Sequence, residues 1–253
     1  GKQLYAAGIN TNFSPVLDIL SNKENRLFKS RAYGQDANTV SKHGLSFIKG
    51  LSSQGIIPVA KHFPGHGDTS EDSHGVLPVV NIDMNKLENR ELIPFADAIN
   101  LGIDMIMVGH ISFPLIDEKQ KPATKSRVIL TDILRNKMNF KGVALTDDIE
   151  MQGFYDDNLT LEQSILESFN AGIDIFVIGH TKGLQEKVLK ILKDGINEGD
   201  ITEERLNQSL NRIIKVKRKN RLSNNMPLGF DEAYDLFTNQ EYIEFVENIK
   251  NKQ

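Results

Sequence analysis

Hydrophobic and polar positions along the chain repeat one short unit: an amphipathic helix, a glycine, a β-branched residue, and a brief apolar strand that ends in polar residues. Segments 101–110 and 171–180 are two copies of this unit with nearly the same sequence. Further strands of this kind are predicted over 12–16, 58–62 and 144–147. Helical spacing of apolar residues predicts helices over 38–51, 83–101, 160–171, 183–196 and 203–218.

Strands that are apolar on both faces and alternate with helices belong to a parallel sheet covered by helices, which is either an open doubly wound sheet or a closed barrel. Polar clusters follow the ends of at least four predicted strands, and this favours the mouth of a barrel. We therefore predict an α/β fold of the (β/α)8 TIM-like barrel class. Only five strands are clear, and the first residues resemble the end of a helix, so the barrel is expected to be N-terminally incomplete.

The predicted barrel covers residues 1–222, and residues 223–253 are predicted to form a polar linker and a helical tail. The net charge of −4 gives no reason to expect nucleic-acid binding. The longest apolar runs, 105–108 and 175–178, are far shorter than the roughly 20 residues that cross a bilayer, so no membrane insertion is expected. The chain has no cysteine, which permits a reducing compartment. We expect a cytoplasmic protein and leave an extracellular or periplasmic location open.

The segment 61–78, KHFPGHGDTSEDSHGVLP, places three histidines directly after a predicted strand, where loops often carry function. In an extended loop the side chains of Asp72 and His74 point the same way, so the carboxylate can orient the imidazole as a proton shuttle. A solvated loop is the plainer interpretation. Metal binding by the histidines with Asp68 and Asp72 is a third, although Pro64 and Gly65 interrupt the helix that a His-x-x-x-His pair needs.

A second candidate group is Thr146-Asp147-Asp148, at the end of another predicted strand. A carboxylate at the barrel mouth can attack an electrophilic carbon. The alternative role, a helix N-cap, fits Asp148 better than Asp147. Asp147 is therefore a candidate nucleophile.

The sequence from Ala60 to Thr69, followed by Asp-Ser-His and Leu-Pro, resembles the signature of glycoside hydrolase family 3, in its β-N-acetylglucosaminidase (NagZ-like) branch. The resemblance continues through further motifs and covers the chain from its start to about Leu222. These motifs lie at 12–18, 30–34, 91–95, 107–110, 122–124 and 145–151.

The resemblance implies that Asp147 is the catalytic nucleophile and that His74, supported by Asp72, is the general acid/base. It implies sugar contacts for Arg31, Lys61 and His62, for which a salt bridge within the barrel mouth is the alternative. Met151 is expected either to border the acetamide pocket or to pack. No metal and no cofactor are implied. Structural roles are expected for His66, Asp104, His110 and Asp174.

The resemblance therefore implies a retaining exo-β-N-acetylglucosaminidase that releases terminal β-linked GlcNAc through a covalent glycosyl-enzyme. The expected substrate is a small carbohydrate, a GlcNAc-containing muropeptide or disaccharide from peptidoglycan recycling, and the expected state is a monomer. Three alternatives stay open: a β-GlcNAc phosphorylase using the same site, a metal-dependent barrel hydrolase, and an inactive sugar-binding barrel that lacks upstream sugar-holding residues.

Overall fold

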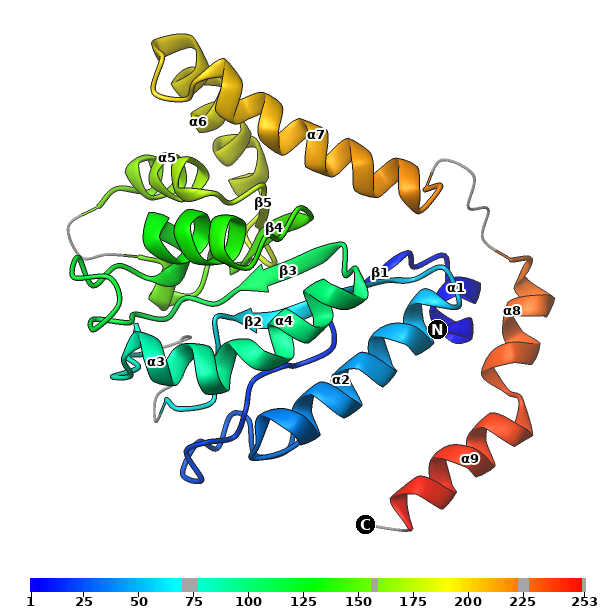
Figure 1. Ribbon diagram of the computed structural model, residues 1–253. Helices are drawn as coiled ribbons and strands as arrows, with labels where there is room; N and C mark the ends of the chain where they lie inside the picture. The colour runs from blue at the N-terminus through cyan, green and yellow to red at the C-terminus, as the bar shows by residue number, and fades with distance from the viewer. Residues whose placement is uncertain (70–76, 156–158, 223–227, 252–253) are drawn as a thin grey trace.

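The computed structural model describes residues 1–69, 77–155, 159–222 and 228–251 (Figure 1). Within these residues, five parallel strands pair in sequential order. They are β1 (Thr11–Asn12), β2 (Ile57–Phe63), β3 (Met105–Val108), β4 (Val143–Asp148) and β5 (Ile175–Val177). A doubly wound sheet reverses its strand order, whereas a barrel wall does not. The predicted α/β barrel class, with fewer than eight strands, is confirmed.

The register of the strands brings the candidate residues to one edge of the sheet. Val108 of β3 pairs with Thr146 of β4, and Asp148 pairs with Val177 of β5. On the other side, Lys61 of β2 forms a parallel bridge with Val16. Because all strands run in the same direction, the residues that end them face a common mouth.

Helices pack along the outer side of this curved sheet (Figure 1). Two of these helices start at a side-chain cap: the Asp36 carboxylate accepts the Thr39 N–H at 2.9 Å, and Thr160 forms a capping box with Gln163. The outer helices are α2 (Ala37–Ser52), α4 (Leu92–Leu101), α5 (Leu161–Ala171) and α6 (Leu184–Glu198). Val216 of α7 (Glu203–Lys219) packs instead against the inner face of the sheet. In the part of the chain that is described, no helix is both long and apolar enough to span a membrane.

Three short helices lie toward the chain ends: α1 (Lys2–Ala6), α8 (Phe230–Phe237) and α9 (Gln240–Lys250). Figure 1 shows α8 and α9 apart from the helices that cover the sheet. Residues of α8 contact α1, and the Lys2 ammonium donates to the Tyr242 hydroxyl of α9 at 3.0 Å. Large apolar side chains of these two helices, such as Phe230 and Phe245, are exposed.

Two helical segments depart from the sequence prediction. The helix expected over 83–101 consists of α3 (Met84–Lys86), a π-helical turn η1 (Leu87–Glu91) and α4. Pro94 lacks an N–H, and its ring would clash with the Arg90 carbonyl in regular α geometry, so the helix widens just before it. A second π-helix, η3 (Val128–Lys137), was not predicted, although the spacing of its buried Ile129, Leu130, Ile133 and Leu134 is helical.

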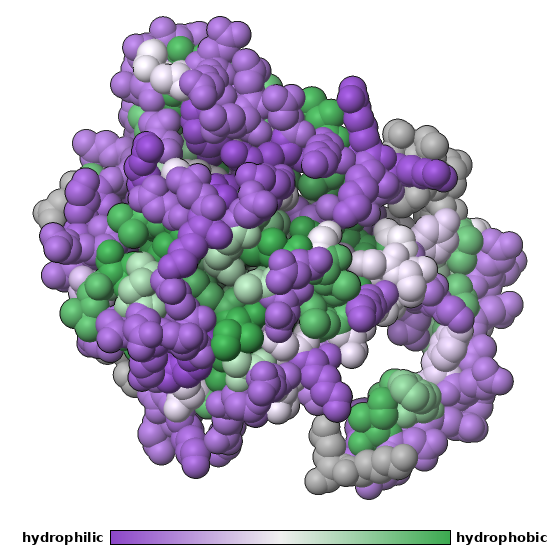
Figure 2. All heavy atoms as spheres, viewed as in Figure 1, coloured by the Kyte–Doolittle hydropathy of each residue, from purple (hydrophilic) through white to green (hydrophobic). Residues whose placement is uncertain are grey.

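Hydrophobic side chains pack on both faces of the sheet. Alternate residues Val143 and Leu145 belong to the inner cluster with Met105 and Met107, whereas Ala144 packs in the larger outer core beneath the helices. The same alternation places Asp147 on the inner side, at the strand's end. Figure 2 shows hydrophobic surface gathered near the middle of one molecular face, with hydrophilic residues around it. The remaining elements are 3-10 turns, η2 (Ala123–Lys125) and η4 (Gln152–Phe154).

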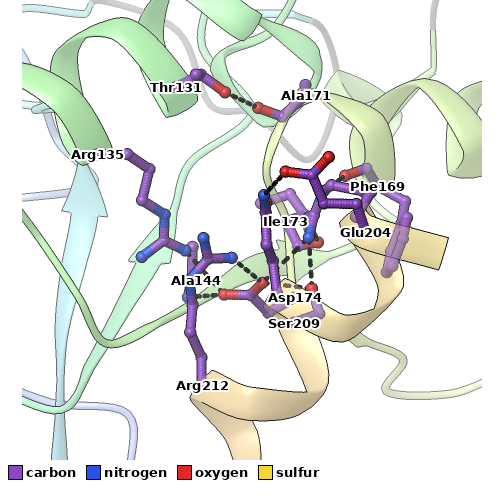
Figure 3. A network of polar contacts seen from close by, with 12 residues as sticks. Thr131, Arg135, Ala144, Phe169, Ala171, Ile173, Asp174, Glu204, Ser209 and Arg212 are labelled. Carbon is purple, nitrogen blue, oxygen red and sulfur yellow. Dashed lines mark hydrogen bonds and ion pairs between the residues drawn. The ribbon is translucent and has the colours of Figure 1, made fainter. Parts of the chain in front are cut away.

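A buried charge network closes the opposite end of the sheet, where β5 begins (Figure 3). The fully buried Asp174 carboxylate accepts from Arg135 at 2.8 Å, Arg212 at 2.9 Å and Ser209 at 2.5 Å. It also accepts the Ala144 N–H at 3.0 Å, which ties β4 to α7. Burial lowers the pKa of Arg135 to about 10, against the opposing effect of Asp174. The expected structural role of Asp174 agrees with this arrangement.

Replacing Asp174 by Asn should lower the free energy of unfolding by about 3–5 kcal/mol, because the buried arginines lose their countercharge. Urea unfolding followed by circular dichroism measures the change. Asp194→Asn is the matched control, since Asp194 pairs with Lys190 on an exposed helix face and the substitution should change stability little. Equal stability of the Asp174 variant and the wild type would contradict this role.

Candidate functional site

Asp147 lies at the end of β4 with its side chain 20% exposed, so the carboxylate reaches the mouth without being free in solvent. Its Oδ1 accepts the Asp148 N–H at 2.9 Å. Its Oδ2 lies 3.8 Å from the Nε2 of His62. One carboxylate oxygen of Asp147 is thus fixed by the backbone, and the other faces the His62 ring near the end of β2.

His62 is held from behind by Asp18, a carboxylate with no exposed surface. Asp18 lies 2.7 Å from the His62 Nδ1 and accepts the N–H groups of His62 and His66. Burial opposes ionisation of Asp18, but the charges and hydrogen bonds of His62 and His66 prevail and hold its pKa below the usual value. His62 therefore pairs with Asp18, as the salt-bridge alternative requires, while its other nitrogen faces Asp147 and its contact with sugar stays a prediction.

Lys61 and Arg31 add positive charge to the same mouth. Burial, and the charge of Arg31, lower the pKa of the half-buried Lys61, while Asp147 and Asp18 act in the opposite direction. The exposed Arg31 guanidinium lies 5.1 Å from the centre of the Phe28 ring, which in turn meets His62 edge-on. The structure thus brings Arg31, Lys61 and His62 together around Asp147.

His110 and Met151 support the turn that follows Asp147. His110 is fully buried at the end of β3, and its Nε2 lies 3.1 Å from the Asp148 carbonyl oxygen, to which it donates. Burial lowers the His110 pKa to about 4, against the pull of the nearby Asp147, so the ring is neutral near pH 7. Met151 is 8% exposed and packs, and a border with an acetamide pocket stays a prediction.

The predicted acid/base pair, Asp72 and His74, lies outside the described residues. The loop leading toward it is anchored at Asp68, which accepts from Ser21 at 3.1 Å and from Arg90 at 2.9 Å. The His66 ring lies 2.9 Å from the Thr69 hydroxyl, consistent with its expected role in shaping the loop. Among the residues that the structure describes, no three acidic or histidine side chains gather as a metal site.

Sequence reasoning missed Asp18 and Glu91. Asp18 lies in the motif 12–18, but its contact with His62 spans 44 positions of sequence, which no local pattern reports. Glu91 is 1% exposed beneath Gly65 and contacts Arg90. Burial raises the Glu91 pKa to about 7, despite the opposing charge of Arg90. A glutamate within an otherwise apolar helical pattern was the sequence signal that could have identified Glu91.

Comparison with known proteins identifies this arrangement. Residues 1–216 match the glycosyl hydrolase family 3 N terminal domain. The chain is 36% identical to beta-hexosaminidase A of Pseudoalteromonas piscicida, over 87% of this chain and 39% of that protein. A glycoside hydrolase family 3 beta-N-acetylglucosaminidase from Paenibacillus sp. str. FPU-7 superposes with a TM-score of 0.87 at 34% identity, over 91% of this chain and 44% of that one. The beta-glucoside phosphorylase BglX superposes with a TM-score of 0.88 at 26% identity, over 96% and 45%.

The chain therefore belongs to glycoside hydrolase family 3, and the family predicted from the motifs is confirmed. It spans less than half the length of the three relatives named above. This chain itself contains the fold and the barrel mouth around Asp147, whereas the activity of the whole protein is a proposal.

Asp18→Asn should lower the free energy of unfolding at neutral pH by about 1.5–3 kcal/mol, because two buried N–H groups and a ring lose a charged acceptor. The depressed pKa of Asp18 means that its contribution is complete above about pH 4 and is lost as pH falls through the lower pKa of the folded state. Unfolding measured from pH 7 to pH 2 should show the two proteins converging in acid. A constant difference across that range would contradict the assignment.

Proposed function

We propose that this chain carries the active site of a retaining β-N-acetylglucosaminidase, with Asp147 as its nucleophile. The proposal rests on the Asp147 carboxylate, which is partly exposed at the barrel mouth of a family 3 fold. Around it lie Lys61, His62 and Arg31. Relatives described as beta-hexosaminidase A and β-N-acetylglucosaminidase support the choice of substrate class.

In the first step, the Asp147 Oδ2 attacks the anomeric carbon, and the bond from that carbon to the leaving oxygen breaks. His74 donates its proton to that oxygen, and Asp72 stabilises the imidazolium before transfer. The sugar is then an ester of Asp147. Because the second oxygen of Asp147 is bonded to the Asp148 N–H, the attacking oxygen is held toward the mouth.

In the second step, neutral His74 removes a proton from water, and the oxygen of that water attacks the anomeric carbon. The bond to Asp147 breaks, which restores the carboxylate and leaves the sugar with its original configuration. Lys61, His62 and Arg31 are placed to hold sugar hydroxyls through both steps. No residue of this scheme calls for a metal or an organic cofactor.

The proposed substrate is a muropeptide or a disaccharide with a terminal β-linked GlcNAc, acted on in the cytoplasm by a monomer. Relatives described as beta-hexosaminidase A and beta-N-acetylglucosaminidase support the terminal GlcNAc unit. Release of GlcNAc from purified muropeptides, compared with release from chitobiose, tests this choice.

Asp147→Ala should reduce turnover of p-nitrophenyl-β-GlcNAc by about 10⁴-fold or more, because no covalent intermediate can form. A slow 5-fluoro substrate should leave a sugar on the wild-type Asp147 peptide, as measured by mass spectrometry. Asp194→Asn, on an exposed helix face away from the mouth, serves as the control and should keep wild-type turnover. A label on Asp148 instead of Asp147 would overturn the assignment.

His74→Ala should slow hydrolysis of a natural disaccharide far more than that of a nitrophenyl glycoside, because a good leaving group departs without a proton. With the nitrophenyl substrate the glycosyl-enzyme should accumulate, and azide should restore turnover as a β-glycosyl azide. Asp72→Asn should show a weaker form of both effects. Equal losses for good and poor leaving groups, with no azide rescue, would exclude His74 as the acid/base.

Phosphorolysis at the same site is a second candidate function. The superposition with a beta-glucoside phosphorylase favours it, as does the close pair of cations Lys61 and Arg31 at the mouth. A histidine base is neutral after donating its proton, so it repels a phosphate acceptor less than a carboxylate would. Analysis of the product in phosphate buffer decides between GlcNAc-1-phosphate and free GlcNAc.

A further inference from the structure

The turn that follows Asp147 is fixed by a chain of contacts to its own backbone. Asp147 accepts the Asp148 N–H, and the Asp148 Oδ1 accepts the Glu150 N–H at 3.1 Å. The Met151 N–H donates to the Asp148 carbonyl oxygen at 3.1 Å. The position of Asp148 therefore sets the direction of the Asp147 carboxylate.

Glu150 extends from this turn to the loop that follows β5. Its Oε2 accepts the N–H groups of Gly179 at 3.1 Å and His180 at 2.6 Å, and its Oε1 accepts the Thr181 N–H at 2.8 Å. Three consecutive N–H groups that converge on one carboxylate form an anion-binding concavity. Hydrogen bonding to Thr181 and to the neighbouring N–H groups lowers the Glu150 pKa, so the acceptor is ionised near pH 7.

Gly179 lets this loop lie directly against the turn. A Cβ at position 179 would lie 2.4 Å from the Asp148 Oδ2, which leaves no room for any other residue without movement. The exposed His180 ring lies 3.7 Å from the same oxygen. The glycine at position 179 thus leaves room for residues 179–181 next to Asp148, and the Glu150 contacts hold them there.

The other side of the turn is held by His110, which follows β3 and donates to the Asp148 carbonyl. On the β5 side, the backbone contributes the Ile149 N–H to the Val177 oxygen at 3.0 Å, and Glu150 supplies the remaining contacts described above. The turn is therefore held from the β3 side by His110 and from the β5 side by the Val177 oxygen and by Glu150. Of these contacts, the ones on the β5 side involve an acidic side chain, that of Glu150.

We propose that Glu150 is a positioning residue for the Asp147 nucleophile, acting through Asp148 by holding the turn to residues 179–181. The proposal rests on the proposed function, since it assumes that Asp147 attacks the sugar. Glu150 lies on the β5 side of Asp147, whereas Lys61 and His62 lie on the β2 side. Loss of Glu150 should therefore slow bond formation and leave binding of the sugar unchanged.

Glu150→Gln tests the proposal, because the amide has the same shape but its NH2 group cannot accept an N–H. The rate of covalent labelling of Asp147 by 5-fluoro-N-acetylglucosaminyl fluoride should fall about 10- to 100-fold, as expected for a misdirected nucleophile. The inhibition constant of GlcNAc should stay within about twofold. Glu118→Gln makes the same chemical change at an exposed position and should behave as wild type.

Glu150→Asp keeps the charge with a shorter reach and should give an intermediate labelling rate, so it decides the matter if the glutamine variant does not fold. Labelling rates are expressed per reactive site, counted from the final extent of labelling. An unchanged rate per site in a folded variant overturns the proposal, even if stability falls. If the wild-type protein is never labelled, the proposed function itself is refuted, and the role proposed for Glu150 is refuted with it.

Discussion

The mouth of this barrel depends on a carboxylate that has no contact with solvent. Asp18 lies between the segment after β1 and the end of β2, and its charge is tolerated because His62 and His66 surround it with donors. An ionised group in such a place has few alternative positions, so the residues that satisfy it are fixed as well. His62 is thereby directed at Asp147.

A second buried aspartate has the corresponding function at the opposite end of the sheet. Asp174 joins the start of β5, the backbone of β4 and two arginines of neighbouring helices. Between the two ends the inner face of the sheet is apolar, as Leu145 and Met107 show. The Asp174 network and the mouth around Asp147 thus lie at opposite ends of the same strands, as is usual for this architecture.

The turn that follows Asp147 adds a different kind of constraint. Asp147 continues the inward alternation of β4, but strand geometry alone does not direct a carboxylate after the strand ends. Direction comes from neighbours on both sides: His110, which follows β3, and the loop after β5, which Glu150 contacts. The position of the Asp147 carboxylate thus depends on strands that are far apart in the sequence.

The sequence by itself determined the alternation of strands and helices and the barrel class, because periodicity depends only on residues a few positions apart. Its local motifs identified the family and placed Asp147 at the end of a strand. Tertiary structure alone decided that Asp18 supports His62 and that Glu150 meets residues 179–181, because contacts between segments about 30 to 44 positions apart leave no local pattern. The helix η3 was also missed, although its buried residues have helical spacing, and that spacing does not report whether a helix is α or π.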